Sequence, residues 1–157
     1  MKLYCFGESG HSYKVALALE LAECEWQPIF VDFFKGETRS EVYLRDVNNM
    51  GEAPVLVDGE KKISQSGLIQ AYLAEKTGKH GGRNSSEKEN ILRWTLWDNS
   101  KFSTVIGITR FLMNFVLKGK CPQEVIDMNQ SRLKVAFKIL NNALEGKSFL
   151  VGDSITH

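Results

Sequence analysis

The sequence predicts an α/β domain with four strands, followed by an all-helical domain. Strand and helix signals alternate before residue 80, and only helix signals follow it. A polar, Gly-rich stretch without periodicity separates the two parts. We therefore expect domains at 1–78 and 86–157, with a linker at 79–85. A chain of 157 residues can bury a core of this kind without metal or disulfide staples.

The first domain shows the element order βαβαββα. Short apolar runs predict the strands, an i, i+3, i+4, i+7 pattern predicts the first helix, and Asp58-Gly59 predicts a hairpin turn. The last helix should end at Gly78, because glycine tolerates the left-handed conformation at a helix end. The expected elements are strands at 2–6 and 26–31, helices at 12–22 and 40–46, a hairpin at 54–63, and a helix through 68–73.

The second domain is expected to contain two long helices. Ser86 and Glu89 fit a capping box, so the first helix should begin at Ser86 and run to residue 118, with a bend near Gly107. Pro122 marks the start of the second helix. Its apolar stripe is formed by Leu133, Phe137, Leu140 and Leu144.

Composition and charge argue against several classes of protein. The 20 Lys and Arg residues nearly balance the 19 Asp and Glu residues, which argues against nucleic acid as a partner. The three cysteines are widely spaced and form no CxxC motif, so we expect neither a disulfide framework nor a metal site. No signal peptide is recognisable, and no apolar run approaches the ~18 residues of a membrane span. We therefore expect a cytoplasmic protein without a membrane partner.

The loop at residues 6–15 lies between a predicted strand and the N-terminus of a helix. Free N–H groups and the helix dipole favour an anion at such a place. The hydroxyl of Ser9 or Ser12 can hydrogen-bond an ionised group and lower its pKa. The alternative is that Ser12 only caps the helix and Ser9 is an ordinary loop residue. We expect His11 to be a solvated loop residue.

Two further segments carry polar features. Pro54 opens a strand after a turn-rich stretch, so the Ala53–Pro54 bond is a candidate for a cis peptide, although a trans proline also fits an edge strand. Gln65 and Ser66 precede a helix, where a hydroxyl and free N–H groups can hold a carboxylate. The alternative is that Ser66 is simply an N-cap.

In their order and spacing, these segments resemble the glutathione transferases over residues 1–156. Ser9-Gly10-His11-Ser12 stands where thioredoxin-fold redox proteins carry Cys-x-x-Cys, and where serine-type transferases (theta-like and related bacterial enzymes) carry a catalytic serine. Ala53-Pro54 matches the family's cis-proline, Gln65-Ser66 its Glu/Gln-Ser pair, and 149–156 the segment that leads into the central helix of its second domain. The resemblance implies a thioredoxin-like first domain with a mixed four-stranded sheet, and an all-α second domain.

The resemblance also implies that glutathione is the co-substrate, and it assigns roles to single residues. Ser9 would donate a hydrogen bond to the glutathione sulfur, because the thiolate is the nucleophile and a free thiol is mostly protonated at pH 7. Tyr4, where tyrosine-type relatives keep their catalytic residue, and Ser12 are alternatives. The glutathione-binding residues would be Ala53 through its backbone, Pro54, Gln65 and Ser66 at the γ-glutamyl end, and Arg39 at the glycine carboxylate. A small hydrophobic electrophile would lie against Phe102, Ile106 and Met113.

The implied activity is conjugation of the glutathione thiolate to electrophiles, in detoxification, by a homodimer. A non-catalytic glutathione-binding or scaffold protein of the same fold is one alternative, and a glutathione-dependent disulfide or peroxide reductase is another. The absence of cysteine at positions 9 and 12 argues only against a dithiol mechanism. The family continues for several helices beyond the position of Thr156. We therefore expect the second domain to be incomplete here and the stripe of Leu133 and Phe137 to lack a cover.

Overall fold

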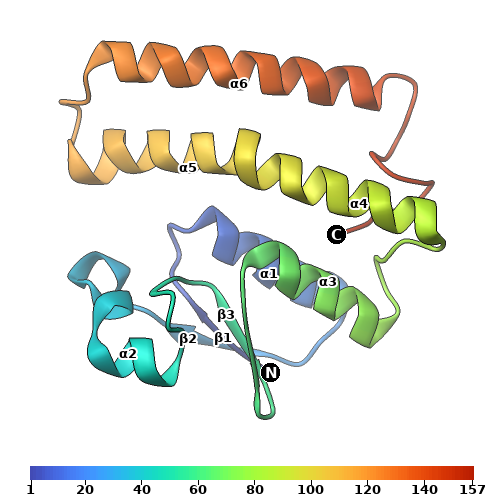
Figure 1. Cartoon of the computed structure of the whole chain (residues 1–157), viewed down its shortest axis with the longest axis horizontal. Helices are drawn as coiled ribbons and strands as arrows, with labels where there is room; N and C mark the ends of the chain where they lie inside the picture. The colour runs from blue at the N-terminus through green and yellow to red at the C-terminus, as the bar shows by residue number, and fades with distance from the viewer. The chain divides into compact units, whose positions relative to one another are not determined.

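The computed structural model describes all 157 residues and divides into two compact units (Figure 1). The first comprises Met1–Gly81 together with His157, and the second comprises Gly82–Thr156. The division falls inside the stretch that the sequence predicts as a linker. His157 was expected with the helical domain, but its backbone N–H donates to the carbonyl of His80 at 2.9 Å, which places it with the first unit.

The first unit is built on a mixed four-stranded sheet with the order β2-β1-β3-β4. Strand β1 (Lys2–Cys5) pairs in parallel with β2 (Gln27–Phe30) and antiparallel with β3 (Val55–Asp58). Strand β3 pairs antiparallel with β4 (Lys61–Ser64). Parallel strands need a crossover connection, and helix α1 (Gly10–Leu21) provides it between β1 and β2. The thioredoxin-like order βαβαββα that was expected is confirmed.

Helices α1 and α3 (Ser66–Thr77) cover one face of this sheet, and α2 (Glu41–Asp46) lies at the other (Figure 1). Burial of a large apolar side chain contributes about 1.5–3 kcal/mol, so the layer between the sheet and the two helices dominates the stability of this unit. The core consists of Leu3, Val15, Leu19, Leu56, Ile63, Ile69 and Leu73, all buried.

The second unit contains the helices α4 (Ser85–Trp97), α5 (Ser103–Phe111) and α6 (Gln123–Leu144). Two π-helical turns, Asp98–Phe102 and Leu112–Val116, continue the helical run after α4 and after α5. The predicted single helix is therefore irregular at these turns. Gly107, where a bend was expected, lies inside regular α5.

The N-terminus of α4 differs from the predicted capping box. Asn84, and not Ser86, is the N-cap, and its Oδ1 accepts a hydrogen bond from the N–H of Glu87 at 2.9 Å. The carboxylate of Glu87 accepts in return from the N–H of Arg83 at 2.8 Å. The Arg83 guanidinium also bonds Glu87 at 2.9 Å and Asp153 at 3.1 Å, and it holds the pKa of the Glu87 carboxyl below its ordinary value. The helix is thus capped by Asn84, two residues earlier than predicted, and Glu87 bonds the N–H of the residue before the N-cap.

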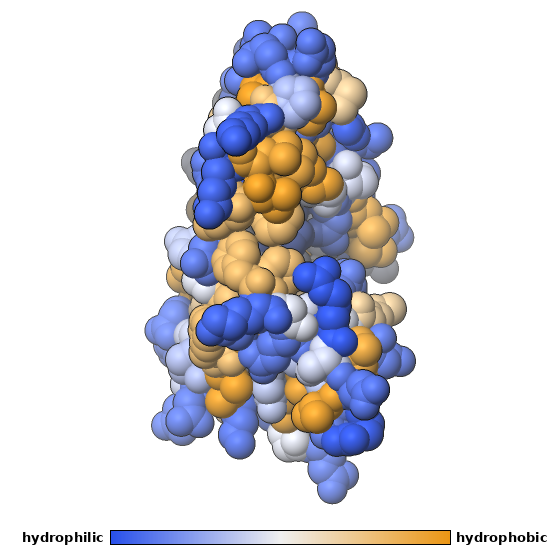
Figure 2. Space-filling model, turned by 90° about the vertical axis from the view of Figure 1, so that its left-hand side faces the viewer, coloured by the Kyte–Doolittle hydropathy of each residue, from blue (hydrophilic) through white to orange (hydrophobic).

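Helix α6 packs on α5 and the preceding π-helical turn through a face that includes Leu133 and Leu140 of the predicted stripe, both half-buried, and is turned toward Asn129 and Ala136. Its buried residues are Asn129 and Ala136, whereas Phe137 is 50% exposed although its ring meets Phe102 edge to face at 5.1 Å. Figure 2 shows apolar residues gathered at the end of this unit where α5 gives way to α6. Exposed apolar residues in the unit include Phe111, Met113, Val116, Met128, Val135 and Ile139. None of the helices is both long and apolar enough to span a bilayer.

The loop between α2 and β3 is held closely by its own residues. Gly51 has a φ of +67°, and a Cβ at this position would approach the carbonyl oxygen of Thr38 to 3.1 Å. Asn48 is buried, and its amide donates to the carbonyl of Glu52 at 3.0 Å while its Oδ1 accepts from the N–H of Met50 at 3.1 Å. Only glycine fits position 51 without strain.

We expect Gly51→Ala to lower the free energy of unfolding by about 1–3 kcal/mol, because a side chain in the left-handed region is strained and would also crowd Thr38. Gly107→Ala is the matched control, since a Cβ there meets nothing within 4 Å and alanine is the better helix former. Urea denaturation followed by circular dichroism measures both variants. Equal stability of the two variants would contradict this account of the loop.

Candidate active site

Ser9 lies at the N-terminus of α1 and is its N-cap. Its Oγ accepts a hydrogen bond from the N–H of Ser12 at 3.1 Å, so the alternative in which Ser12 caps the helix is wrong. The first turn of α1 contains no acidic residue that would offset the positive end of the helix dipole. The bond to Ser12 uses only a lone pair of Ser9, which leaves the hydroxyl proton available to an anion.

Ser12 itself lies on the buried face of α1, together with Val15 and Leu19. Its side chain is 4% exposed, and its Oγ has no hydrogen-bond partner in the structure. Of the two hydroxyls in the loop, that of Ser9 is therefore the more accessible to a ligand.

His11 connects the N-termini of α1 and α3. Its Nδ1 and the Oγ of Ser66 share a hydrogen bond of 3.0 Å, although the residues are 55 positions apart. The expectation that His11 is a solvated loop residue is therefore wrong. Ser66 is the first residue of α3 and is 5% exposed. This contact places Ser66 and the N-terminal turn of α3 beside the loop that carries Ser9.

Gln65 precedes α3 in a left-handed conformation, with a φ of 71°. Its Nε2 donates to Oε2 of Glu52 at 2.6 Å, so the α2–β3 loop and the start of α3 are joined. The Ala53–Pro54 bond next to Glu52 is cis, as predicted. The sequence predicted Ala53, Pro54, Gln65 and Ser66 as site residues, and it gave no signal for Glu52.

Tyr4 lies on the other face of β1 from the core residue Leu3, because side chains alternate along a strand. Its ring meets that of Tyr43 edge to face, with the centroids 6.5 Å apart. The hydroxyl of Tyr43 donates to the Glu52 carbonyl at 2.9 Å. Burial raises the pKa of Tyr43 to about 12, and the nearby Glu37 carboxylate and Tyr4 phenol add to this shift. Tyr43 therefore stays protonated and remains a donor at neutral pH.

The remaining predicted residues lie elsewhere. Arg39 is exposed at the end of the turn Glu37–Arg39, which precedes α2. In the helical unit, Phe102 stacks on Trp97 at a centroid distance of 6.0 Å and also meets Phe137. Ile106 is half-buried on α5, and Met113 is exposed on the π-helical turn after it.

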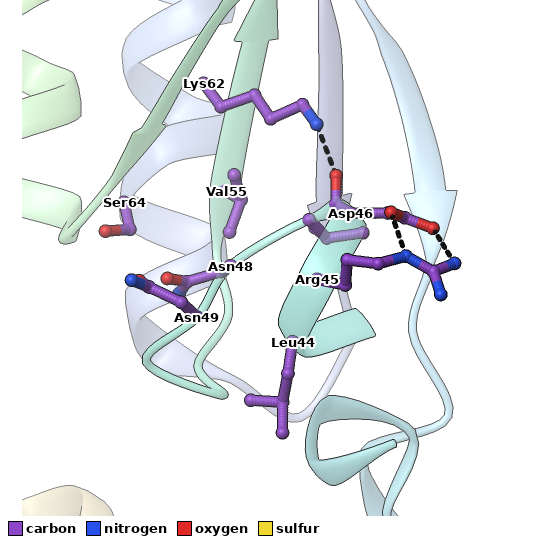
Figure 3. A pocket seen from close by; sticks show the side chains of 9 residues that line it. Leu44, Arg45, Asp46, Asn48, Asn49, Val55, Lys62 and Ser64 are labelled. Carbon is purple, nitrogen blue, oxygen red and sulfur yellow. Dashed lines mark hydrogen bonds and ion pairs between the residues drawn. The ribbon is translucent and has the colours of Figure 1, made fainter. Parts of the chain in front are cut away.

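A polar hollow of about 340 Å³ lies between α2 and the β3–β4 hairpin (Figure 3). Its two cationic side chains, those of Arg45 and Lys62, already bond to Asp46. The ammonium of Lys62 donates to the carbonyl of Asp46, and Arg45 pairs with the Asp46 carboxylate at 2.7 Å. None of the predicted site residues lines this hollow, whose walls are formed by Leu44, Arg45, Asp46, Val47, Asn48, Asn49, Val55, Lys62 and Ser64.

The cysteines and the acidic residues offer no second reactive centre. Cys5, Cys24 and Cys121 are all free thiols. Burial raises the pKa of the Cys5 thiol, so it is mostly protonated at neutral pH. No three His, Cys, Asp or Glu side chains come together closely enough to hold a metal ion.

Comparison with known proteins agrees with the fold of the chain. Residues 1–75 match the family model of the glutathione S-transferase N-terminal domain. The chain belongs to the glutathione transferase family. Within the family, it is 28% identical to a zeta-class glutathione S-transferase of Euphorbia esula, over 99% of this chain and 69% of that protein.

Other members of the family carry different names and ligands. The chain is 28% identical to the disulfide-bond oxidoreductase YfcG of Escherichia coli strain K12, over 95% of this chain and 71% of that protein. It has the same fold as a glutathione transferase from Pseudomonas putida solved with glutathione disulfide bound. The TM-score is 0.87 at 19% identity, over 99% of this chain and 69% of that one.

We expect His11 and Ser66 to be coupled by about 1 kcal/mol in a double-mutant cycle with His11→Ala and Ser66→Ala, because each variant alone leaves a hydrogen-bonding group without its partner. The free energy of unfolding of the three variants and the wild type gives this coupling. Tyr13→Ala with Ser66→Ala is the control cycle, since Tyr13 is exposed on the same helix, and its coupling should be near zero. Equal couplings in the two cycles would contradict the contact.

Proposed function

We propose that this protein is a serine-type glutathione transferase, theta-like or of a related bacterial kind, which joins the thiolate of glutathione to hydrophobic electrophiles. The observation that supports this most is the position of Ser9. Its hydroxyl caps a helix that lacks acidic residues in its first turn, and its proton is free to bond a sulfur anion. A pKa decrease of two units takes about 2.7 kcal/mol, and one charge-assisted hydrogen bond together with a helix N-terminus supplies energy of that order.

In this proposal, glutathione lies along the α2–β3 loop and the starts of α1 and α3. The γ-glutamyl carboxylate accepts hydrogen bonds at the N-terminus of α3 and from Ser66, and Gln65 lies beside the same end of the ligand. The backbone of Ala53 pairs with the cysteinyl part, next to Pro54. The glycine carboxylate meets Arg39. The electrophile lies against Phe102, Ile106 and Met113.

In the proposed reaction, the protein forms no covalent bond to either substrate. The glutathione thiol releases its proton to water, and Ser9 stabilises the thiolate that remains. The sulfur lone pair then forms a carbon–sulfur bond to the electrophile, and the displaced electron pair leaves with the leaving group or takes up a proton. The hydrogen bond of Ser9 strengthens when the sulfur becomes anionic, so its effect should fall mainly on kcat.

Similarity to the oxidoreductase YfcG favours a second candidate, a glutathione-dependent disulfide reductase. Here the same thiolate attacks a disulfide, one thiolate leaves, and a second glutathione releases the product as glutathione disulfide. This route needs no cysteine of the protein, which fits the protonated state of Cys5. A panel of electrophiles and small disulfides, assayed with glutathione, distinguishes the two activities. Activity with neither class would favour the non-catalytic, scaffold alternative.

We also propose that the protein acts as a cytoplasmic homodimer in detoxification. Support comes from the similarity to a zeta-class glutathione S-transferase and from the family match over residues 1–75. Size-exclusion chromatography with light scattering tests the dimer. A monodisperse monomer would contradict it.

We expect Ser9→Ala to lower kcat by about one to three decades while glutathione affinity stays within a few-fold. Ser9→Gly is the matched variant, because glycine at an N-cap costs only a few tenths of a kcal/mol and has no side-chain donor. Glycine should keep most of the stability that alanine loses, while the thiol pKa of bound glutathione rises in both variants. Stopped-flow kinetics and ultraviolet titration of the bound thiolate measure these effects.

If Tyr4 or Ser12 is the catalytic residue instead of Ser9, a different result is expected. If Tyr4→Phe or Ser12→Ala lowers kcat more than Ser9→Ala does, the serine-type assignment to Ser9 is wrong. Thermal unfolding of each variant separates a loss of chemistry from a loss of structure.

A further inference from the structure

The polar hollow between α2 and the β3–β4 hairpin has the size and the lining of a small-molecule site. Its volume of about 340 Å³ lies within the range of ligand pockets, which begins at about 300 Å³. Buried Val55 and half-buried Val47 give it apolar surface, and Asn49, Lys62 and Ser64 give it polar groups. None of the residues assigned to glutathione lines it.

Lys62 carries the one charge of the hollow that no carboxylate neutralises. The carboxylate of Asp46 is paired with Arg45 through two hydrogen bonds, of 2.8 and 2.7 Å. Arg45 lowers the pKa of the Asp46 carboxyl more than Lys62 does, so Arg45 is the main partner of this carboxylate. Lys62 donates instead to the backbone carbonyl of Asp46, which is a neutral acceptor (Figure 3). An ammonium group carries more N–H donors than this one bond uses, so a single negative charge is favoured beside it.

Two uncharged side chains in the same hollow have hydrogen-bonding capacity that the protein does not use. Lys62 and Ser64 alternate with the core residue Ile63, so both face away from the core, about 7 Å apart along β4. The Ser64 hydroxyl has only a long contact of 4.0 Å with the sulfur of Met50, which is a weak acceptor. The amide of Asn49 has no hydrogen-bond partner in the protein. Both groups can bond hydroxyls of a ligand whose negative group lies at Lys62.

We propose that this hollow is a second binding site, which takes a small hydroxy-carboxylate. The carboxylate pairs with the ammonium group of Lys62, and the hydroxyls bond to Ser64 and Asn49. A phosphate ester fits less well, because it carries a charge of about −1.5 to −2 at neutral pH and Arg45 is already paired with Asp46. The site is separate from the one proposed for glutathione, so the two ligands bind without competing.

The test is a titration of the whole, isotopically labelled chain with gluconate as the probe, followed through amide chemical shifts in NMR spectra. We expect saturable shifts at Asn49, Lys62 and Ser64. Lys62→Gln should weaken gluconate binding by about 3- to 10-fold, the range for an exposed charge pair with a hydrogen bond.

Lys61→Gln is the matched control, because it removes the same charge from the same strand. The ammonium group of Lys61 lies 4.3 Å from the centre of the Tyr72 ring, on the other face of β4, so binding should stay within about two-fold. Ser64→Ala leaves every ion pair intact and tests the same site if Lys62→Gln does not fold. It should weaken gluconate binding by about 2- to 10-fold.

Three further ligands test the chemical class. Sorbitol, which has the hydroxyls of gluconate but no charge, should bind more weakly than gluconate, and so should glycerol 3-phosphate. Glutathione should not displace gluconate. The proposal is overturned if the hollow shows no saturable shifts, or if Lys62→Gln and Lys61→Gln have equal effects. Binding of sorbitol or glycerol 3-phosphate as tightly as gluconate, or displacement of gluconate by glutathione, would also overturn it.

Discussion

The carbonyl oxygen of Glu52 accepts two hydrogen bonds, from Tyr43 of α2 and from Asn48, and the candidate site depends on this junction. Both donors come from the face of the sheet opposite α1 and α3, or from the loop itself. They hold the segment that leads into Pro54, and thereby place Ala53, Glu52 and, through Glu52, Gln65. Because the Tyr43 hydroxyl stays protonated far above neutral pH, this junction keeps its donor under all physiological conditions.

The protein offers an anion two helix ends instead of a cluster of basic side chains. The starts of α1 and α3 are brought together by His11 and Ser66, and the first N–H groups of a helix have no partner within the helix itself. In the proposed function, a chain with a formal charge of only +1 would bind an anionic peptide in this way. Attraction from N–H groups acts at short range and depends on geometry, so it favours a ligand of the right shape over other anions.

Periodicity was sufficient to predict the order of the elements, because the core positions of α1, α3 and the strands repeat at the spacing that each structure requires. The cap residues were harder to predict. Ser9 and Ser12, or Asn84 and Ser86, lie within one helical turn, and each of these side chains can cap a helix. The hydrogen-bonded pairs His11–Ser66 and Glu52–Gln65 could not be predicted from the sequence. The two residues of each pair are 55 and 13 positions apart, and they meet only when the chain is folded. Their position before a helix pointed to Gln65 and Ser66, and the family resemblance assigned their roles, whereas Glu52 was found only from the geometry.

The ion pairs of Arg83 have a consequence for the architecture of the helical unit. Arg83 stands at its entrance and Asp153 near its end, 70 residues later, so the bond between them brings the two ends of the unit together. The segment before α4 and the segment after α6 are therefore held side by side. The turn between α5 and α6 lies away from this bond and can therefore change in length without separating the two segments.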